Sequence, residues 1–357
     1  MKQRMIERRF NRCLLRPADL PPSQPDVRVV GVFNPAAAAT PEGVTLLIRV
    51  AETAREKRPG WVALPRWDLE AGRITMDWLR EEEVDFLDPR MVIVKATGLR
   101  RLTFISHLTV ATSRDGRALD TASSARFFPA DENEEFGVED PRLTPLDGRF
   151  YFTYVAVSPH GAATALASTT DFRRFTRHGI IFPPENKDVV LFPERIGGRF
   201  VALHRPNPHQ HFAAPEMWLA TSPDLRHWGE HQPFLGSGGE WDVGRVGAGA
   251  PPLRTEAGWL EIYHGNDRRP GKPGVGAYSA GLLLLDAADP ARILAVRGRA
   301  MTPETDYERH GFVPNVVFPT AAVPRGENLL VYYGAADEAC GVLEWRLADV
   351  LAALRPE

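Results

Sequence analysis

Short apolar runs alternate with turn-forming residues along most of the chain. From residue 29 onward the runs are rich in Val, Phe, Tyr and Leu, and Gly, Pro, Asp or Asn separate them. β-Branched and aromatic residues favour strands, and the separating residues are those that turns require. The pattern therefore predicts an all-β protein with few long helices.

Five of the predicted strands share an opening segment, in which a proline precedes a turn and an aromatic strand. The prolines recur at intervals of roughly 50 to 70 residues, at Pro89, Pro141, Pro193, Pro251 and Pro319. Two copies read Asp-Pro-Arg, at residues 88–90 and 140–142. Repeats of this length are typical of radially arranged sheets, so we predict a five-bladed β-propeller. Its opening segments are expected to converge near the axis and form a pocket.

The N-terminal residues follow a helical spacing instead. Apolar side chains recur at this spacing over residues 2–15, at Met5, Ile6, Phe10, Cys13 and Leu14. Several prolines follow, which would end a helix. We therefore expect a short N-terminal helical arm over residues 1–28 and a propeller domain over residues 29–357. The arm is expected to pack on its own propeller or, alternatively, to reach a partner subunit and form a homo-oligomer.

One charged segment breaks the strand pattern. Residues 51–87 contain three of the eight tryptophans, Trp61, Trp67 and Trp78, followed by three consecutive glutamates. We interpret this segment as an insertion over one face of the ring. Its role is left open.

Composition excludes several classes of function. A net charge of −3 and a pI near 6.4 give no basic surface for nucleic acid. Cys13 and Cys340 have neither metal-ligand nor disulfide-scaffold spacing, which favours a reducing compartment. No apolar run has the length of a signal-peptide core or a membrane span. We therefore predict a cytoplasmic protein that contacts neither nucleic acid nor membrane.

The acidic residue with the strongest case for chemistry is Asp140, which follows Phe136-Gly137-Val138 at an opening segment. Among apolar neighbours its pKa would rise, and it could act as a general acid. The alternative is a structural ion pair with Arg142, two residues away. In contrast, Asp88 in the other Asp-Pro-Arg copy is expected to repeat the motif with a structural role only.

Cationic side chains gather in the repeats that follow. Lys187 precedes an opening segment, and Arg205 and His264 close apolar strand runs at equivalent places in neighbouring repeats. Their convergence would suit a tetrahedral oxyanion such as phosphate. The sequence has no Gly-rich nucleotide loop, so no nucleotide cofactor is implied. Three nearby histidines lack a recognisable metal spacing, and we expect no metal site: His204, His209 and His211.

Eight segments in order give the chain a resemblance to a known family. They run from about Val32 to Asp337 and read GVFNPAA, LLIRV, the Glu-Asp-Pro-Arg of residues 139–142, NKDVVLFPERIGGRF, LHRP, ATSPDLRHW, GAGAPPLRTEAGWLEIYHG and VYYGAAD. Together they resemble glycoside hydrolase family 130, the β-mannoside phosphorylases and related β-mannosidases. The resemblance implies a five-bladed β-propeller.

The resemblance also implies an activity, inverting phosphorolysis of a β-mannoside. Inorganic phosphate, as co-substrate and with no cofactor, would attack the anomeric carbon and release α-mannose 1-phosphate. The family's catalytic acid falls on Asp140, whose proton would travel through a hydroxyl of the mannosyl ring. The phosphate ligands fall on four residues, Lys187, Arg205, His264 and Tyr278. Substrate-binding positions fall on Asn34, Arg49, Asp188 and Asp337, and on His107, where some relatives carry Arg.

Two other functions stay open. A β-mannosidase of the same fold would need a base to activate water, and Glu194 and Glu216 are candidates. A non-catalytic sugar-binding propeller would need no acid facing cations. The linkage, β-1,2 or β-1,4, and the leaving sugar, whether mannose, glucose or N-acetylglucosamine, also stay open.

Overall fold

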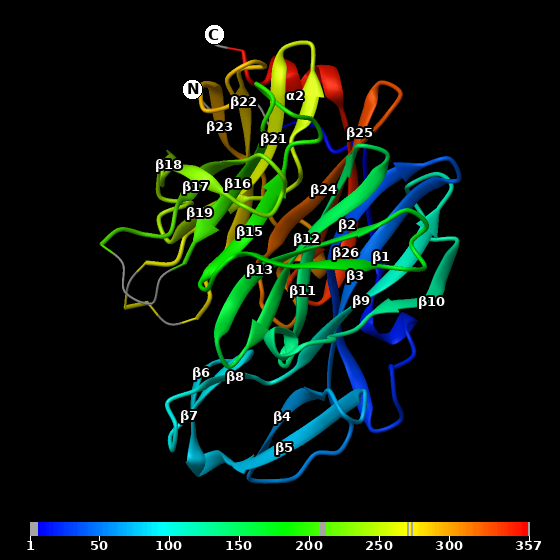
Figure 1. Cartoon of the computed structure of the whole chain (residues 1–357), viewed down its shortest axis with the longest axis vertical. Coiled ribbons are helices and arrows are strands. Elements are labelled where there is room, and N and C mark those ends of the chain that lie inside the picture. Colours follow the sequence, from blue (N-terminus) through cyan, green and yellow to red (C-terminus); the bar gives the residue numbers. More distant parts are fainter. Residues whose placement is uncertain (1–5, 208–211, 270, 273, 356–357) are drawn as a thin grey trace.

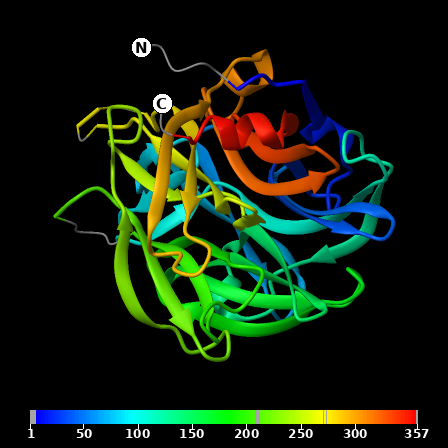
Figure 2. The same cartoon turned by 90° about the horizontal axis from the view of Figure 1, so that it is seen from above.

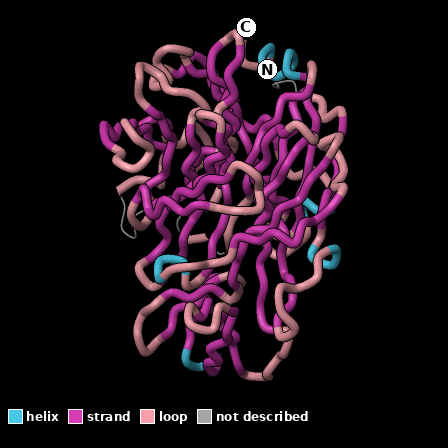
Figure 3. The backbone as a smooth tube through the Cα atoms, turned by 45° about the vertical axis from the view of Figure 1, so that its right-hand side comes forward, coloured by secondary structure: helices cyan, strands magenta, loops and turns pink. Residues whose placement is uncertain are grey.

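The computed structural model describes residues 6–207, 212–269, 271–272 and 274–355. Strands make up most of this part of the chain, and its helices are short (Figure 3). Within it, five sheets of four or five strands form the blades, and two smaller sheets form an insertion. The prediction of an all-β, five-bladed architecture is confirmed.

Four blades are antiparallel sheets whose strands come from successive parts of the chain (Figure 1). The first contains β2 (Val27–Thr40), β3 (Gly43–Ala54), β9 (Ile105–Ser113) and β10 (Thr121–Phe127). The second contains β11 (Gly137–Leu146), β12 (Arg149–Ser158), β13 (Gly161–Thr169) and β14 (Thr176–Phe182). The third contains β15 (Asn186–Leu191), β16 (Phe200–Pro206), β17 (Met217–Ser222) and β18 (Gly229–Leu235). The fourth contains β19 (Arg245–Ala248), β20 (Leu253–Thr255), β21 (Gly258–Asn266), β22 (Tyr278–Leu285) and β23 (Ile293–Met301).

The fifth blade joins the two ends of the chain. It contains β24 (Val317–Arg325), β25 (Asn328–Ala335), β26 (Ala339–Arg346) and β1 (Phe10–Leu15). β1 pairs with β26, so the start of the chain lies beside its last strands (Figure 2). Inner strands of successive blades touch, β2 with β11, β11 with β15 and β15 with β19, and β24 touches β2. Polar residues on these inner strands therefore lie around the centre of the ring.

The prediction of a helix over residues 2–15 is wrong for residues 10–15, which form β1. The apolar spacing there fits a strand as well as a helix. β26 would otherwise present an unpaired edge, and pairing with β1 satisfies its backbone groups. Tertiary pairing therefore decides the conformation of this short segment.

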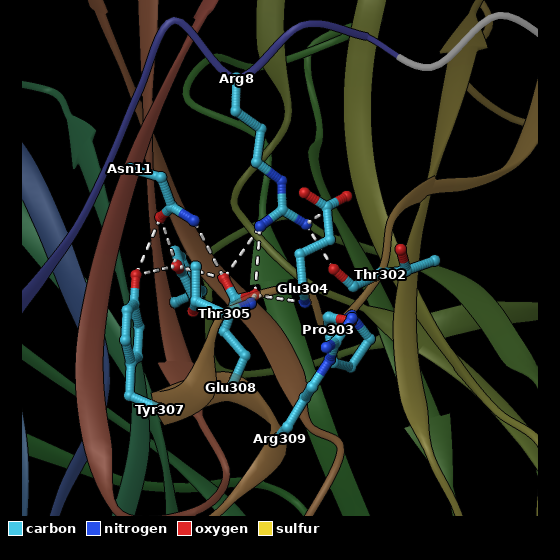
Figure 4. Close-up of polar contacts among 10 residues, drawn as sticks. Arg8, Asn11, Thr302, Pro303, Glu304, Thr305, Tyr307, Glu308 and Arg309 are labelled. Atoms are coloured by element: carbon cyan, nitrogen blue, oxygen red, sulfur yellow. Dashed lines mark hydrogen bonds and ion pairs between the residues drawn. The ribbon is translucent and has the colours of Figure 1, made fainter.

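A buried polar cluster fixes this N-terminal segment (Figure 4). Arg8 Nη1 lies 2.9 Å from Glu308 Oε1, and the fully buried Glu308 also accepts from Tyr333 Oη at 2.7 Å. Asn11 belongs to the same cluster, because its Oδ1 accepts a hydrogen bond from Tyr307 Oη at 2.9 Å. The arm thus packs on its own propeller from residue 8 onward.

The hydrophobic core is divided among the gaps between blades. Leu47 of the first blade packs with Phe152 of the second, and Leu46 packs with Tyr332 of the fifth. Similar clusters lie between the second and third, third and fourth, and fourth and fifth blades. A strand buried on both faces is apolar nearly throughout, which accounts for the run VTLLIRVA at residues 44–51.

The expected insertion separates β3 from β9 and continues to residue 102. It contains a two-stranded and a three-stranded sheet, β4 (Trp61–Asp68), β5 (Arg73–Arg80), β6 (Val84–Asp88), β7 (Met91–Val94) and β8 (Arg100–Leu102). Figure 1 shows it extending from one end of the ring. Asp88-Pro89-Arg90 is the turn between β6 and β7, so it does not open a blade as predicted. The first blade opens on β2 instead, with Asn34-Pro35.

Helices are minor, and turns carry several of the acidic residues. The described helices are α1 (Asp306–Arg309), α2 (Leu347–Ala352) and the 3₁₀ turns Pro17–Asp19, Glu81–Glu83 and Glu132–Glu134. Asp115, Asp171 and Asp224 each accept a hydrogen bond from a backbone amide two residues on, at 2.8, 2.8 and 2.9 Å. Among the helices described here, none has the length and apolar character needed to cross a membrane.

Candidate active site

Three inner strands carry a polar residue at the same interruption of their ladder. The register shifts at Asn34 in β2, at Asp140 in β11 and at Asp188 in β15, where two residues oppose one on the neighbouring strand. Their φ angles are 50°, 49° and 56°. Asn and Asp tolerate this left-handed conformation better than other side chains, and a bulge re-aims the side chain that it holds. The bulges direct three polar groups toward the centre.

Asp140 is held by two donors from the first blade. Its Oδ1 accepts from Asn34 Nδ2 and from Arg49 Nη1, each at 2.7 Å. The other edge of Arg49 is engaged as well, because Nη2 donates to Glu139 at 2.7 Å and Nε donates to Ser106 at 2.9 Å. These contacts bring together three residues singled out in the sequence, Asn34, Arg49 and Asp140.

The expected rise in the pKa of Asp140 is wrong for the free protein. Burial raises the pKa of this carboxyl, but the charges of Arg49 and Arg142 and the hydrogen bonds from Asn34 and Arg49 outweigh burial and lower it. The alternative ion pair with Arg142 is also not what forms, because Arg142 Nη1 donates to the backbone oxygen of Asp140 at 3.0 Å. Arg49 is the ion-pair partner of Asp140.

Asp337 is a second carboxyl close to this group, in the turn between β25 and β26. It has a φ of 50°, and its Oδ2 lies 3.2 Å from Arg90 Nη1. Burial raises its pKa above the usual value, and the charge of Asp140 adds to that rise, while Arg90 and Arg49 oppose it. Two neighbouring carboxyls therefore have pKa values shifted in opposite directions.

Asp188 is the centre of the cation group. Its Oδ2 lies 2.6 Å from Arg205 Nη2 and 3.4 Å from His264 Nε2, and its Oδ1 lies 3.8 Å from Arg142 Nη2. A Cβ atom at Gly247 would lie 2.8 Å from Asp188 Oδ2, so glycine permits this close approach of β19. Burial raises the pKa of Asp188, but the charge of Arg205, the interaction with His264 and the charge of Arg142 outweigh burial and lower it.

Several donor nitrogens in this group make no hydrogen bond to the protein. Within the described residues, Arg205 Nε and Nη1 and Arg142 Nη2 are buried and donate no hydrogen bond. Burial lowers the pKa of Arg142, although Asp188 and Asp140 oppose that effect. Buried donors without partners are costly. Their convergence beside Asp188 therefore fits the binding of an anion.

The other expected phosphate ligands border the same group. Lys187 lies directly opposite Arg205 in the β15–β16 register, so both side chains share one face. His264 is fully buried, and its ring centroid lies 6.0 Å from that of Tyr278, which is 9% exposed. Burial lowers the pKa of His264 most, although Asp188 raises it. The structure thus brings all four residues to one region.

His107 is the candidate that the structure does not bring to this group. The β3–β9 register places Arg49 and Ser106 on one face of the sheet and His107 on the other. There, Nε2 of His107 lies 3.3 Å from Glu52 Oε2 and its ring packs on Phe128. In the described part of the chain, no contact links it to Asp140.

Sequence reasoning missed several residues of the site. The sequence suggested Arg142 only as an ion-pair partner of Asp140, and Arg90 only as part of a structural repeat of the Asp-Pro-Arg motif. Glu261 was not considered. It is fully buried beside Arg142, its Oε1 accepts from the Gly249 amide at 3.2 Å, and burial raises its pKa well above the usual value. A charged residue within an otherwise apolar strand run, LEIYH, is the signal that could have identified it.

No group of three His, Cys, Asp or Glu side chains among the described residues could hold a metal ion. His209 and His211 lie outside the described residues.

Comparison with known proteins identifies the family. The profile of glycoside hydrolase family 130, described as beta-1,4-mannooligosaccharide phosphorylase, matches residues 73–355. The chain is 37% identical to a beta-1,2-mannobiose phosphorylase of Listeria innocua over 96% of its own length and 97% of the relative. It is 34% identical to a 1,2-beta-oligomannan phosphorylase of Thermoanaerobacter sp., over 69% of its length and 81% of the relative. The solved structure of the Listeria innocua enzyme in complex with beta-1,2-mannobiose superposes with a TM-score of 0.88 over 96% of both chains. The chain belongs to glycoside hydrolase family 130.

Proposed function

We propose that this protein catalyses inverting phosphorolysis of a β-mannoside, with inorganic phosphate as co-substrate and α-mannose 1-phosphate as product. The observation that carries the proposal is the set of buried guanidinium nitrogens that make no hydrogen bond to the protein, Arg205 Nε and Nη1 and Arg142 Nη2. Arg142 also donates from Nη1 to the backbone oxygen of Asp140, which links this group to the proposed acid. Phosphate accepts hydrogen bonds from such planar donors with two oxygens at once. An acid beside an anion site is what phosphorolysis requires.

The reaction needs one acid and one nucleophile. A phosphate oxygen attacks the anomeric carbon from the face opposite the leaving group, and the glycosidic C–O bond breaks. Asp140 supplies the proton that the departing oxygen takes up, through a hydroxyl of the mannosyl ring. Phosphate is already anionic near neutral pH, so no second carboxylate has to activate it, unlike water in an inverting hydrolase.

The lowered pKa of Asp140 makes the acid depend on phosphate. Arg49 and Arg142 keep this carboxyl ionised in the free protein. A phosphate dianion bound at Arg142 and Arg205 would offset these positive charges. It would therefore raise the pKa of Asp140 and favour the protonated acid. Without phosphate, the charges of Arg49 and Arg142 favour the ionised form of Asp140, which cannot act as an acid. Hydrolysis by water is therefore disfavoured.

The two residues considered as the base of a hydrolase, Glu194 and Glu216, lie elsewhere in the described structure. The side chain of Glu194 is 56% exposed and lies 3.9 Å from the exposed Arg254. Glu216 lies against Gly236, just after β18. Neither is part of the group around Asp188 described above.

The finer properties of the substrate remain proposals. We propose a β-1,2-linked mannobiose or short oligomannan, since the relatives at 37% and 34% identity are named for such substrates. The test is a panel of β-1,2-mannobiose, β-1,4-mannobiose, mannosylglucose and mannosyl-N-acetylglucosamine, each with phosphate, in which mannose 1-phosphate is measured. We expect the highest kcat/KM for β-1,2-mannobiose. A preference for a β-1,4-linked sugar would contradict the linkage and leave phosphorolysis standing.

Two further proposals concern the setting of the enzyme. We propose a cytoplasmic location, because Cys13 and Cys340 are free thiols on adjacent strands of the fifth blade. We also propose a homo-oligomer through the N-terminal arm, in which residues 8–15 keep the contacts with their own propeller. Light scattering of the full chain and of a variant shortened at its start measures the oligomer directly.

A further inference from the structure

The turn between β6 and β7 places Arg90 of the insertion at the edge of the site. Asp88 holds the guanidinium, accepting from Arg90 Nε at 3.2 Å and from Nη2 at 3.0 Å. The turn itself is held to the segment that leads into β9 of the first blade, because Thr103 Oγ1 donates to the oxygen of Pro89 at 2.8 Å and the Thr103 amide donates to the oxygen of Arg90 at 3.0 Å. These contacts leave Nη1 to face Asp337.

Arg90 contacts the site through its ion pair with Asp337. Its Nη1 is 3.2 Å from Asp337 Oδ2, and its charge lowers the pKa of Asp337 against burial. The Arg90 side chain is 28% exposed, so part of it remains open to a ligand.

The insertion also packs on the segment that leads into Asp140. The Trp67 amide donates to the oxygen of Glu135 at 2.7 Å, and the Trp67 ring stacks on Phe128 at 5.2 Å. Arg101 lies over the ring of Phe136, 4.3 Å from its centroid. The insertion therefore contacts two segments that carry site residues, the segment before Asp140 and the turn that holds Asp337.

We propose that Arg90 is a positioning residue that determines specificity, because it fixes the carboxyl of Asp337 for contact with the sugar. Through it the inserted sheets take part in holding the mannoside, while phosphate is held by the blades alone. This inference rests on the proposed function of the site. It predicts an effect of Arg90 on the sugar that is separate from any effect on phosphate.

The test compares Arg90→Ala, Arg90→Lys and a control, Arg73→Ala. Arg73 belongs to the same insertion, but it pairs with Asp26 at the surface, with 54% of its side chain exposed. We expect Arg90→Ala to raise KM for β-1,2-mannobiose by roughly tenfold or more, as for loss of a charge-assisted hydrogen bond. KM for phosphate should change less than about twofold. Arg90→Lys should recover part of the loss, and Arg73→Ala should match the unmutated enzyme.

A merely structural role predicts a different result. If Arg90→Ala matches Arg73→Ala, or raises both KM values equally, the inference is overturned. The pH profile gives a second readout, since loss of Arg90 should move the limb that reports Asp337 to higher pH. If the unmutated protein turns over none of the β-mannosides of the panel with phosphate, the proposed function fails separately. Calorimetric binding of β-1,2-mannobiose then decides the inference: weaker binding by Arg90→Ala than by Arg73→Ala supports it, and equal binding overturns it.

Discussion

Arg49 Nη1 lies 2.7 Å from Asp140 Oδ1, so the residue proposed as the acid is held as an anion in the free protein. The same guanidinium holds Glu139 and Ser106, which fixes its orientation. An acid that is ionised at rest must gain its proton in the complex. This relationship links the chemistry of Asp140 to the occupancy of the anion site.

Asp140→Asn should nearly abolish turnover while the fold is retained. An amide keeps the hydrogen bond from Asn34 but cannot supply a proton, and general acids contribute roughly 10²- to 10⁴-fold to rate. The measurement is kcat with β-1,2-mannobiose and phosphate, with exposed Asp171→Asn as the control. A loss of less than about tenfold would remove Asp140 from the role of acid.

Phosphate binding should be accompanied by proton uptake. At about pH 7, isothermal titration in buffers of different ionisation enthalpy measures the protons taken up, and the expected value approaches one proton per site. The Asp140→Asn variant measures the proton uptake that does not involve Asp140. It should take up fewer protons than the unmutated protein when phosphate binds. Equal uptake by the two proteins would contradict the coupling of Asp140 to phosphate.

Arg205→Ala should weaken phosphate selectively. Removal of a buried guanidinium with two unpartnered nitrogens should raise KM for phosphate by roughly tenfold or more, with little change in KM for the sugar. Arg199→Ala is the matched control, because Arg199 lies just before β16 with a side chain 41% exposed. A rise in KM for the sugar alone would place Arg205 in the sugar site.

Glu261→Gln should stabilise the protein at neutral pH more than at acidic pH. The folded pKa of Glu261 is raised, so the folded state binds a proton that the unfolded state loses above about pH 4.5. The stability due to this group is therefore full below that pH and is lost as pH rises toward the folded pKa, at about 1.4 kcal/mol per pH unit. Glutamine removes this slope. Urea unfolding of both proteins at pH 5 and pH 7 checks it, and parallel slopes would mean that Glu261 is ionised in the fold.

Much of the fold and part of the site could be predicted from the sequence because apolar runs and turn residues are local signals. The equivalent positions of the strands that open the blades were harder to identify in the sequence. Asp140 and Asp188 occupy equivalent bulges, yet Asp188 has no proline after it, so counting prolines selected Pro193 instead. Arg90 could not be placed, because its ion pair with Asp337 joins residues 247 positions apart. Long-range contacts of this kind leave no local pattern.

The central claim is that phosphate is the nucleophile. The most direct measurement follows β-1,2-mannobiose by NMR in the presence and absence of phosphate, with purified protein and otherwise identical buffer. The account predicts that mannose and α-mannose 1-phosphate appear together in equal amounts only when phosphate is present. Release of mannose at the same rate without phosphate would contradict it.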